Sequence, residues 1–134
     1  GWSGGWFYAD RVGGPISADL GQGGVRPGTL FRQDLGYLGT SGLVMRRRVL
    51  DALDGFDERY DPTCYEDTDL SLQIRALGFE LAYCPYLGLG HTPHQTTQAG
   101  SRAHIALMER NGLYFIEKWR TRRPDLIARY CAAD

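Results

Sequence analysis

The chain has 134 residues, of which 43% are hydrophobic and 23% charged, a composition that indicates one globular domain and excludes a disordered chain. Fifteen Lys+Arg residues against sixteen Asp+Glu residues give a formal net charge of -1, which argues against a general nucleic-acid-binding domain. No apolar run approaches the ~20 residues needed to span a bilayer. Three cysteines at wide spacing form no zinc or disulfide pattern, and no signal-peptide pattern is present, so we expect a reducing, cytoplasmic location.

Residues 1–34 are rich in glycine and show little hydrophobic periodicity. Segments 6–8 and 16–18 fit either short strands or loop. We favour a glycine-rich loop region that connects elements of a larger fold at the surface.

From residue 36 the patterning becomes regular. Leu70 and Ile74 stand at helical spacing, and Gly78 is a typical helix stop. The predicted elements are extended segments at 37–40 and 43–45, helices at 47–53 and 66–77, a strand at 79–84, a strand or extended loop at 86–91, and helices at 101–119 and 124–132. The 101–119 helix is expected to bury one face, made of Ile105, Met108, Gly112, Phe115 and Trp119. This order predicts an α/β or α+β arrangement and only part of a complete sheet.

The densest chemistry lies at the start of the 66–77 helix, where Glu66, Asp67 and Asp69 fall within four residues. Acidic residues in a first turn commonly cap the helix and complement its dipole, which is one interpretation of the cluster. Capping needs one acid, however, and residues 57–61 add further carboxylates nearby. The cluster also suits a general base, a metal ion or the hydroxyl groups of a sugar.

Of the three histidines, His91 is the best placed for function, because glycines flank it and a loop follows. Imidazole is a common ligand of divalent metals. We expect His94 and His104 to be structural or exposed. The basic residues Lys118 and Arg122 belong to a C-terminal basic cluster that we interpret as a solvated face rather than a phosphate or membrane contact.

A series of short motifs carries a resemblance to a known family. The motifs are Gly39-Thr40-Ser41-Gly42, Met45-Arg46-Arg47, Leu53-Asp54-Gly55-Phe56-Asp57-Glu58-Arg59-Tyr60, Tyr65-Glu66-Asp67-Thr68-Asp69-Leu70, Ala76-Leu77-Gly78-Phe79, Tyr83-Cys84-Pro85, His91 and Arg110-Asn111-Gly112. In this order and spacing they closely resemble the C-terminal half of the catalytic domain of family-two glycosyltransferases, over residues 35–119.

The resemblance implies a partial GT-A (Rossmann-like) fold of the α/β class. It consists of the acceptor-binding half, with a mixed sheet and flanking helices, while the nucleotide-binding half is missing. It further implies transfer of a sugar from a nucleotide-sugar donor to a hydroxyl of a glycan or lipid-linked acceptor, with inversion. In this division residues 1–34 are the glycine-rich loop region, 35–119 the acceptor and base half, and 120–134 a C-terminal helix.

The resemblance also implies site residues. Asp67 matches the general base, and Glu66 binds the acceptor or shares that role. The substrate-binding positions are Gly39, Thr40, Ser41, Gly42, Asp69 and Arg75. His91 matches a metal ligand, and the complete enzyme is expected to use Mg²⁺ or Mn²⁺.

The metal–diphosphate Asp-x-Asp motif of the family lies upstream of these elements, and the sequence lacks it; Asp67-Thr68-Asp69 has its spacing in a different place. Gln73-Ile74-Arg75 stands where members often carry two arginines. We therefore expect this chain alone to be inactive, to dimerise through an uncovered sheet edge, and to belong to a parent that associates peripherally with a membrane. Two alternatives are a non-catalytic carbohydrate or protein interaction module and a metal-dependent hydrolase built on Glu66, Asp67, Asp69 and His91.

Overall fold

The computed structural model describes residues 5–9, 15–19, 36–40, 42–82 and 100–132. Its strands are β1 (Gly5–Ala9), β2 (Pro15–Asp19) and β3 (Cys131–Ala132). Its helices are α1 (Arg47–Ala52), the 3-10 helix η1 (Glu58–Tyr60), α2 (Glu66–Ala76), α3 (Arg102–Arg122) and α4 (Pro124–Tyr130). Within the described residues no helix is long and apolar enough to cross a bilayer.

The expectation of an α/β, Rossmann-like partial GT-A fold, in which residues 37–91 supply a mixed sheet with flanking helices, is wrong. Most of the described residues are helical, and the segments predicted to be strands at 37–40, 43–45 and 79–82 form none, apart from a single bridge at Tyr37. The backbone of Leu38 shows the reason: its N–H and C=O both bond the hydroxyl of Ser71, at 3.0 and 3.3 Å, in place of a neighbouring strand. The predicted segments beyond residue 82, up to 91, lie outside the described residues.

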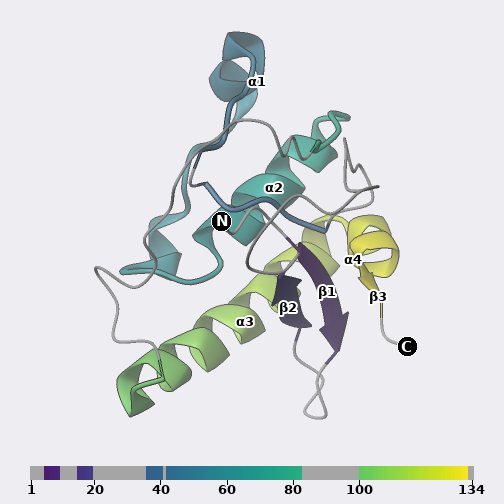
Figure 1. Cartoon of the computed structure of the whole chain (residues 1–134). Helices are drawn as coiled ribbons and strands as arrows, with labels where there is room; N and C mark the ends of the chain where they lie inside the picture. The colour runs from purple at the N-terminus through teal and green to yellow at the C-terminus, as the bar shows by residue number, and fades with distance from the viewer. Residues whose placement is uncertain (1–4, 10–14, 20–35, 41, 83–99, 133–134) are drawn as a thin grey trace, which may run out of the picture.

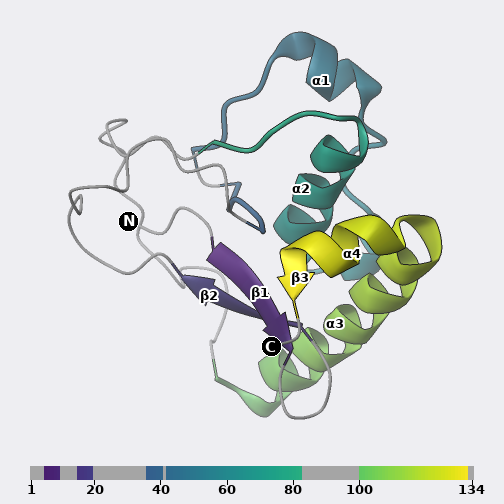
Figure 2. The same ribbon diagram turned by 90° about the vertical axis from the view of Figure 1, so that its right-hand side faces the viewer.

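The strands that do form make a small sheet of the order β2-β1-β3, in which β1 pairs antiparallel with β2 and parallel with β3. It therefore joins the first and last parts of the chain, and 6–8 and 16–18 are strands rather than the loop we favoured. In Figure 2, β3 follows α4 directly and lies beside β1. The last helix ends at Tyr130 because the chain extends there into β3.

Helix α2 is the centre of the fold, and Figure 1 shows it between the projecting α1 and the long α3. It contributes to two clusters of buried side chains. Leu72 packs with Tyr37, Tyr60, Phe115, Trp119 and Leu126. Leu70 and Ile74 pack on another side with Leu38, Val49 and Leu81. Because the helix is covered on more than one side, its first turn is held in a fixed place.

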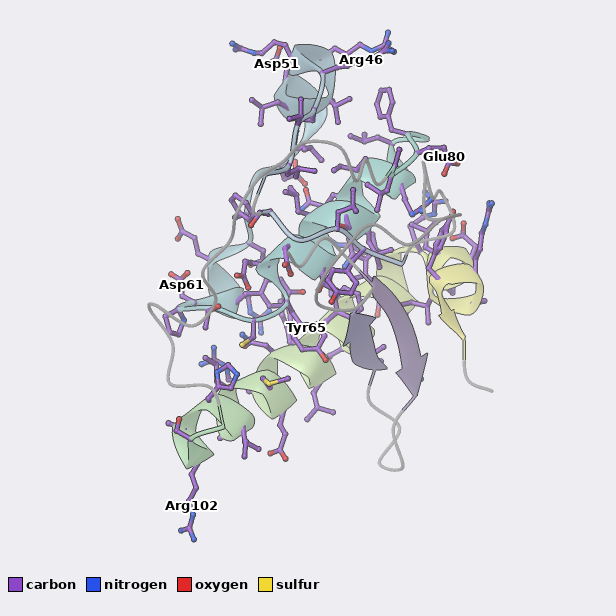
Figure 3. All side chains as sticks on the ribbon, in the orientation of Figure 1. Arg46, Asp51, Asp61, Tyr65, Glu80 and Arg102 are labelled. Atoms are coloured by element: carbon purple, nitrogen blue, oxygen red, sulfur yellow. The ribbon has the colours of Figure 1, made fainter. Side chains whose placement is uncertain are left out.

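In the part of the chain that the structure describes, the buried residues of helix α3 lie from its middle onward. Ser101 caps it by accepting a hydrogen bond from the His104 N–H. Gly112, Phe115 and Trp119 are buried as expected, but the predicted face is wrong at its beginning, because Ile105 and Met108 are 49% and 42% exposed. The first two turns extend beyond α2, and Figure 3 shows Arg102 at their far end pointing away from the other helices.

Candidate functional site

The chain enters α2 through a strained backbone. Cys64 and Tyr65, neither of them glycine, have φ angles of 76° and 75°. This left-handed conformation costs a non-glycine residue on the order of 1 kcal/mol or more, and such residues cluster at functional sites. We call residues 60–65 the link. Tyr65 stands at the N-cap of α2 without a side-chain cap, so the conformation of the link decides how Glu66 and Asp67 are presented.

Helix α3 holds the link by hydrogen bonds. The side-chain NH₂ of Asn111, which is 1% exposed, lies 2.9, 2.8 and 2.9 Å from the carbonyl oxygens of Tyr60, Thr63 and Cys64, which share its two protons. The neighbouring Arg110 donates to the Asp61 carbonyl at 2.7 Å and to the Asn111 side-chain oxygen at 2.9 Å. Carbonyls that no regular element satisfies thus find donors on one turn of α3.

The Tyr65 side chain fills the space that Gly112 leaves open. A Cβ added at Gly112 would lie 3.0 Å from the Tyr65 hydroxyl oxygen and 3.2 Å from Cζ. The Tyr65 ring also packs against Phe115, with 5.5 Å between centroids. Figure 3 shows Tyr65 between α2 and α3. Glycine at position 112 therefore lets the link approach α3 closely, at the small cost in helix propensity that glycine carries.

The carboxyls of Glu66 and Asp67 follow the link, and both residues are partly buried, unlike a typical pair of surface acids. Burial, together with the adjacent Glu66 carboxylate, raises the pKa of Asp67 to about 6. Its Oδ1 accepts from the Thr68 N–H at 2.7 Å and the Thr68 hydroxyl at 3.2 Å, so the capping interpretation holds for that oxygen. No side chain among the described residues donates to its Oδ2. Glu66 Oε1 accepts from Thr63 at 3.4 Å, and its buried Oε2 accepts from none of the described residues.

Asp69, predicted to bind substrate, lies instead in the core and is fully buried. Oδ1 accepts from the Tyr60 hydroxyl at 3.0 Å and the Trp119 indole N–H at 2.7 Å. Oδ2 accepts from Gln73 and Lys118, each at 2.9 Å. With these donors in place it has no surface to offer a substrate or a metal, which removes it from the substrate site and from the hydrolase alternative.

Lys118 was expected on a solvated basic face, but it is buried with Asp69 and Asp57. Its ammonium lies 2.9 Å from Asp69 and 2.8 Å from Asp57, and its side chain is 7% exposed. Although burial alone would raise the pKa of Asp57, hydrogen bonds from Lys118 and Tyr114 outweigh it and lower that pKa to about 2. Lys118 also lines a shallow groove of about 290 Å³, together with Arg59 and Arg122.

The Gly39–Gly42 segment lies within reach of the same end of α2, because Ser71, which holds Leu38, also donates to the Asp67 carbonyl at 2.8 Å. Gly39 is buried, whereas Thr40 and Gly42 are exposed and take part in a turn closed by the Leu43 N–H on the Thr40 carbonyl at 3.1 Å. Ser41 lies outside the described residues.

Arg75, the remaining predicted substrate-binding residue, is at the opposite end of α2, roughly 12 Å from Asp67 along the helix axis. Its side chain is 2% exposed and donates to Glu80 at 2.8 Å and to the Tyr130 hydroxyl at 2.7 Å. It therefore fastens α2 to α4 and does not join the site.

His91, the predicted metal ligand, lies outside the described residues, as does His94. Nowhere in the described ranges do three or more His, Cys, Asp or Glu side chains gather so as to hold a metal ion. The described residues by themselves thus do not form a centre for Mg²⁺ or Mn²⁺, and this cofactor remains a prediction. His104 Nδ1 is 4.0 Å from Cys64 Sγ, and burial raises the pKa of that thiol, followed by the effect of Glu66. Cys64 is thus a weak nucleophile.

Comparison with known proteins identifies no family. No protein-family model and no solved structure matches the chain. It is similar to an uncharacterized protein, y4gI, of Sinorhizobium fredii (strain NBRC 101917 / NGR234), with 28% identity over 94 residues. The match covers 68% of this chain and 10% of that protein, so the chain spans about a tenth of the length of this relative.

Proposed function

We propose that this chain supplies the acceptor-side general base of an inverting glycosyltransferase, and that Asp67 is that base. The observation that carries the proposal is the Asp67 carboxyl itself, next to Glu66 in the first turn of a buried helix, with its pKa raised to about 6 and no described side chain donating to Oδ2. A general base works best when its pKa lies near the working pH, and an ordinary aspartate at 3.8 would be a weaker one.

In the proposed reaction the acceptor hydroxyl oxygen bonds to the anomeric carbon of the donor sugar, and the bond from that carbon to the nucleoside diphosphate breaks. The hydroxyl proton passes to Asp67 as the new bond forms, and attack on the face opposite the leaving group inverts the anomeric centre. Glu66 lies beside it to bind the acceptor or share the proton.

Two kinds of support stand behind this proposal. The first is the ordered series of motifs over residues 35–119 that resembles family-two glycosyltransferases. The second is the contrast between Asp67 and Asp69, because both oxygens of Asp69 accept from described side chains, whereas none donates to Asp67 Oδ2. The nucleotide-sugar donor and the glycan or lipid-linked acceptor belong to the proposal. The proposal does not include a Rossmann-like fold, because the described elements do not form one.

The test is a transfer assay on the longest natural polypeptide that contains this chain, with a panel of nucleotide-sugars and both Mg²⁺ and Mn²⁺. We expect Asp67→Asn to lower kcat by about 10²-fold or more, the usual contribution of a general base, with donor affinity preserved. The pH profile of kcat/KM should rise with a midpoint near 6. Asp51→Asn, on the exposed α1, is the matched control and should keep full activity.

Two results contradict the proposal. Release of nucleoside diphosphate from none of the donors argues against a glycosyltransferase. Unchanged turnover in a folded Asp67→Asn variant removes Asp67 as the base. Carbohydrate binding that survives this substitution, without turnover, would instead favour the non-catalytic interaction module.

A further inference from the structure

We propose that Arg110, Asn111 and Gly112 of α3 act as one positioning unit, which holds the link in its left-handed conformation and thereby fixes the first turn of α2, where Glu66 and Asp67 stand. The link is defined above as residues 60–65. The catalytic consequence of this inference rests on the proposed function, but the positioning itself does not.

The first step is that the link cannot hold this shape by itself. Cys64 and Tyr65 adopt φ angles of 76° and 75° in succession, a conformation that L side chains disfavour. The structure around such residues must over-determine their conformation. At the N-cap the backbone of α2 contributes one hydrogen bond, from the Asp69 N–H to the Tyr65 carbonyl at 2.8 Å, and there is no side-chain cap.

The second step is that consecutive residues of α3 contact consecutive parts of the link. Arg110 bonds the carbonyl of Asp61, and Asn111 bonds those of Tyr60, Thr63 and Cys64. These bonds require a side chain with amide N–H groups at position 111, since a carboxylate has no proton to donate. The buried position of Asn111 leaves the three carbonyls without water as a substitute.

The third step is that Gly112 sets the distance between α3 and the end of the link. A methyl group at this position would meet the Tyr65 hydroxyl oxygen at 3.0 Å and Cζ at 3.2 Å. Tyr65 precedes Glu66 directly, so a ring forced away from α3 moves the first turn of α2. The hydrogen-bond donors of Arg110 and Asn111 and the space left by Gly112 thus act on the link from one turn of α3.

The consequence is measurable at Asp67 without any substrate. If the link loosens, the first turn of α2 gains water and the two carboxyls separate, so the Asp67 carboxyl titrates closer to an ordinary aspartate. The groups that face it, Glu66 on α2, Cys64 on the link and His104 of α3 beside Cys64, are unchanged by substitutions at 110–112.

The experiment is a carboxyl ¹³C NMR titration of the 134-residue chain. We expect Asn111→Ala and Gly112→Ala each to lower the Asp67 midpoint by a unit or more. Arg110→Gln, at an exposed position, should fold and give a smaller shift in the same direction. Adding Tyr65→Phe to Gly112→Ala removes the nearest oxygen and should restore part of the midpoint.

The control is Val49→Ala, which removes a buried side chain of α1 from the cluster that contains no residue of the link. It should destabilise the chain without moving the Asp67 midpoint. The inference is overturned if the three variants at 110–112 leave that midpoint at the wild-type value, or if Val49→Ala moves it as much as they do. Should Asn111→Ala fail to fold, Arg110→Gln and the Gly112→Ala/Tyr65→Phe pair still decide the question. A midpoint that moves while Asp67→Asn leaves transfer intact would retain the positioning and reject the proposed base.

Discussion

Asp67 and Asp69 belong to the same turn of the same helix and have opposite surroundings. Asp69 is fully buried and accepts hydrogen bonds from Tyr60, Gln73, Lys118 and Trp119. Among the described side chains only Thr68 donates to Asp67, which follows Glu66 directly. At 3.6 residues per turn, two positions along a helix differ by about 200° in direction, so one side chain faces the core and the other faces away. Of two acids in the same stretch of sequence, Asp69 therefore has a structural role, whereas Asp67 is the one that we propose for chemistry.

The largest effect should come from Asp69→Asn. This substitution leaves the Lys118 ammonium and two other buried donors facing a neutral amide, and breaking a buried ion pair typically costs about 3–5 kcal/mol. Urea denaturation of the chain should show this loss in the free energy of unfolding. A loss below about 1 kcal/mol would mean that the Asp69 network contributes little, and the contrast with Asp67 would fail.

Asp67→Asn should do the opposite and stabilise the chain at pH 7. Since the pKa of Asp67 is raised in the folded state to about 6, the folded chain binds more protons than the unfolded chain between pH 4 and 6. Stability therefore falls as pH rises through this window, by roughly 2 kcal/mol at most. The asparagine keeps an oxygen for the Thr68 N–H, so the cap survives. Denaturation at pH 4 and pH 7 measures the effect, and a wild-type stability that rises over this window would contradict it.

Asp57→Asn tests the edge of the Asp69 network and should cost less, on the order of 1–2 kcal/mol, because the Asp57 side chain is 20% exposed. Its pKa of about 2 lies below the unfolded value, so the stability that Asp57 contributes is present above pH 4 and lost as pH falls towards 2. The variant should lose this acid-side dependence. If the free energy of unfolding falls equally steeply in wild type and variant between pH 4 and 2, the pairing of Lys118 with Asp57 does not contribute to stability.

The smallest effect should come from Asp51→Asn on α1. The Arg47–Asp51 pair is 2.7 Å apart, but both side chains are mostly exposed, at 84% and 53%. Such pairs contribute about 0.5 kcal/mol or less. Urea denaturation in low and high salt should give nearly the same values for variant and wild type. A loss comparable to that of Asp57→Asn would mean that burial does not separate these carboxylates.

The helices could be predicted from the sequence, whereas the strands predicted at residues 37–40, 43–45 and 79–82 do not form. Spacing such as Leu70 to Ile74, with Gly78 as a stop, is a local signal, and α2 formed as expected. Extended segments give the same local signal whether their backbone pairs with a strand or with a side chain, and Leu38 pairs with Ser71. The role of Asp69 was missed for a related reason. Its partners Tyr60, Lys118 and Trp119 are distant in sequence, and only packing brings them together.

The hold of Asn111 on the link also concerns the chemical lifetime of the chain. Asparagine followed by glycine is the pair in which the next backbone nitrogen most readily attacks the side-chain amide and expels ammonia. Inside α3 the backbone of Gly112 is fixed in the helical conformation, and the amide is engaged with three carbonyls. Both conditions oppose the attack, whereas an unfolded chain lacks them. A molecule that deamidates while unfolded refolds with a carboxylate at position 111, which cannot donate hydrogen bonds to the link. Each unfolding event therefore carries a risk that the geometry around Asp67 is lost permanently.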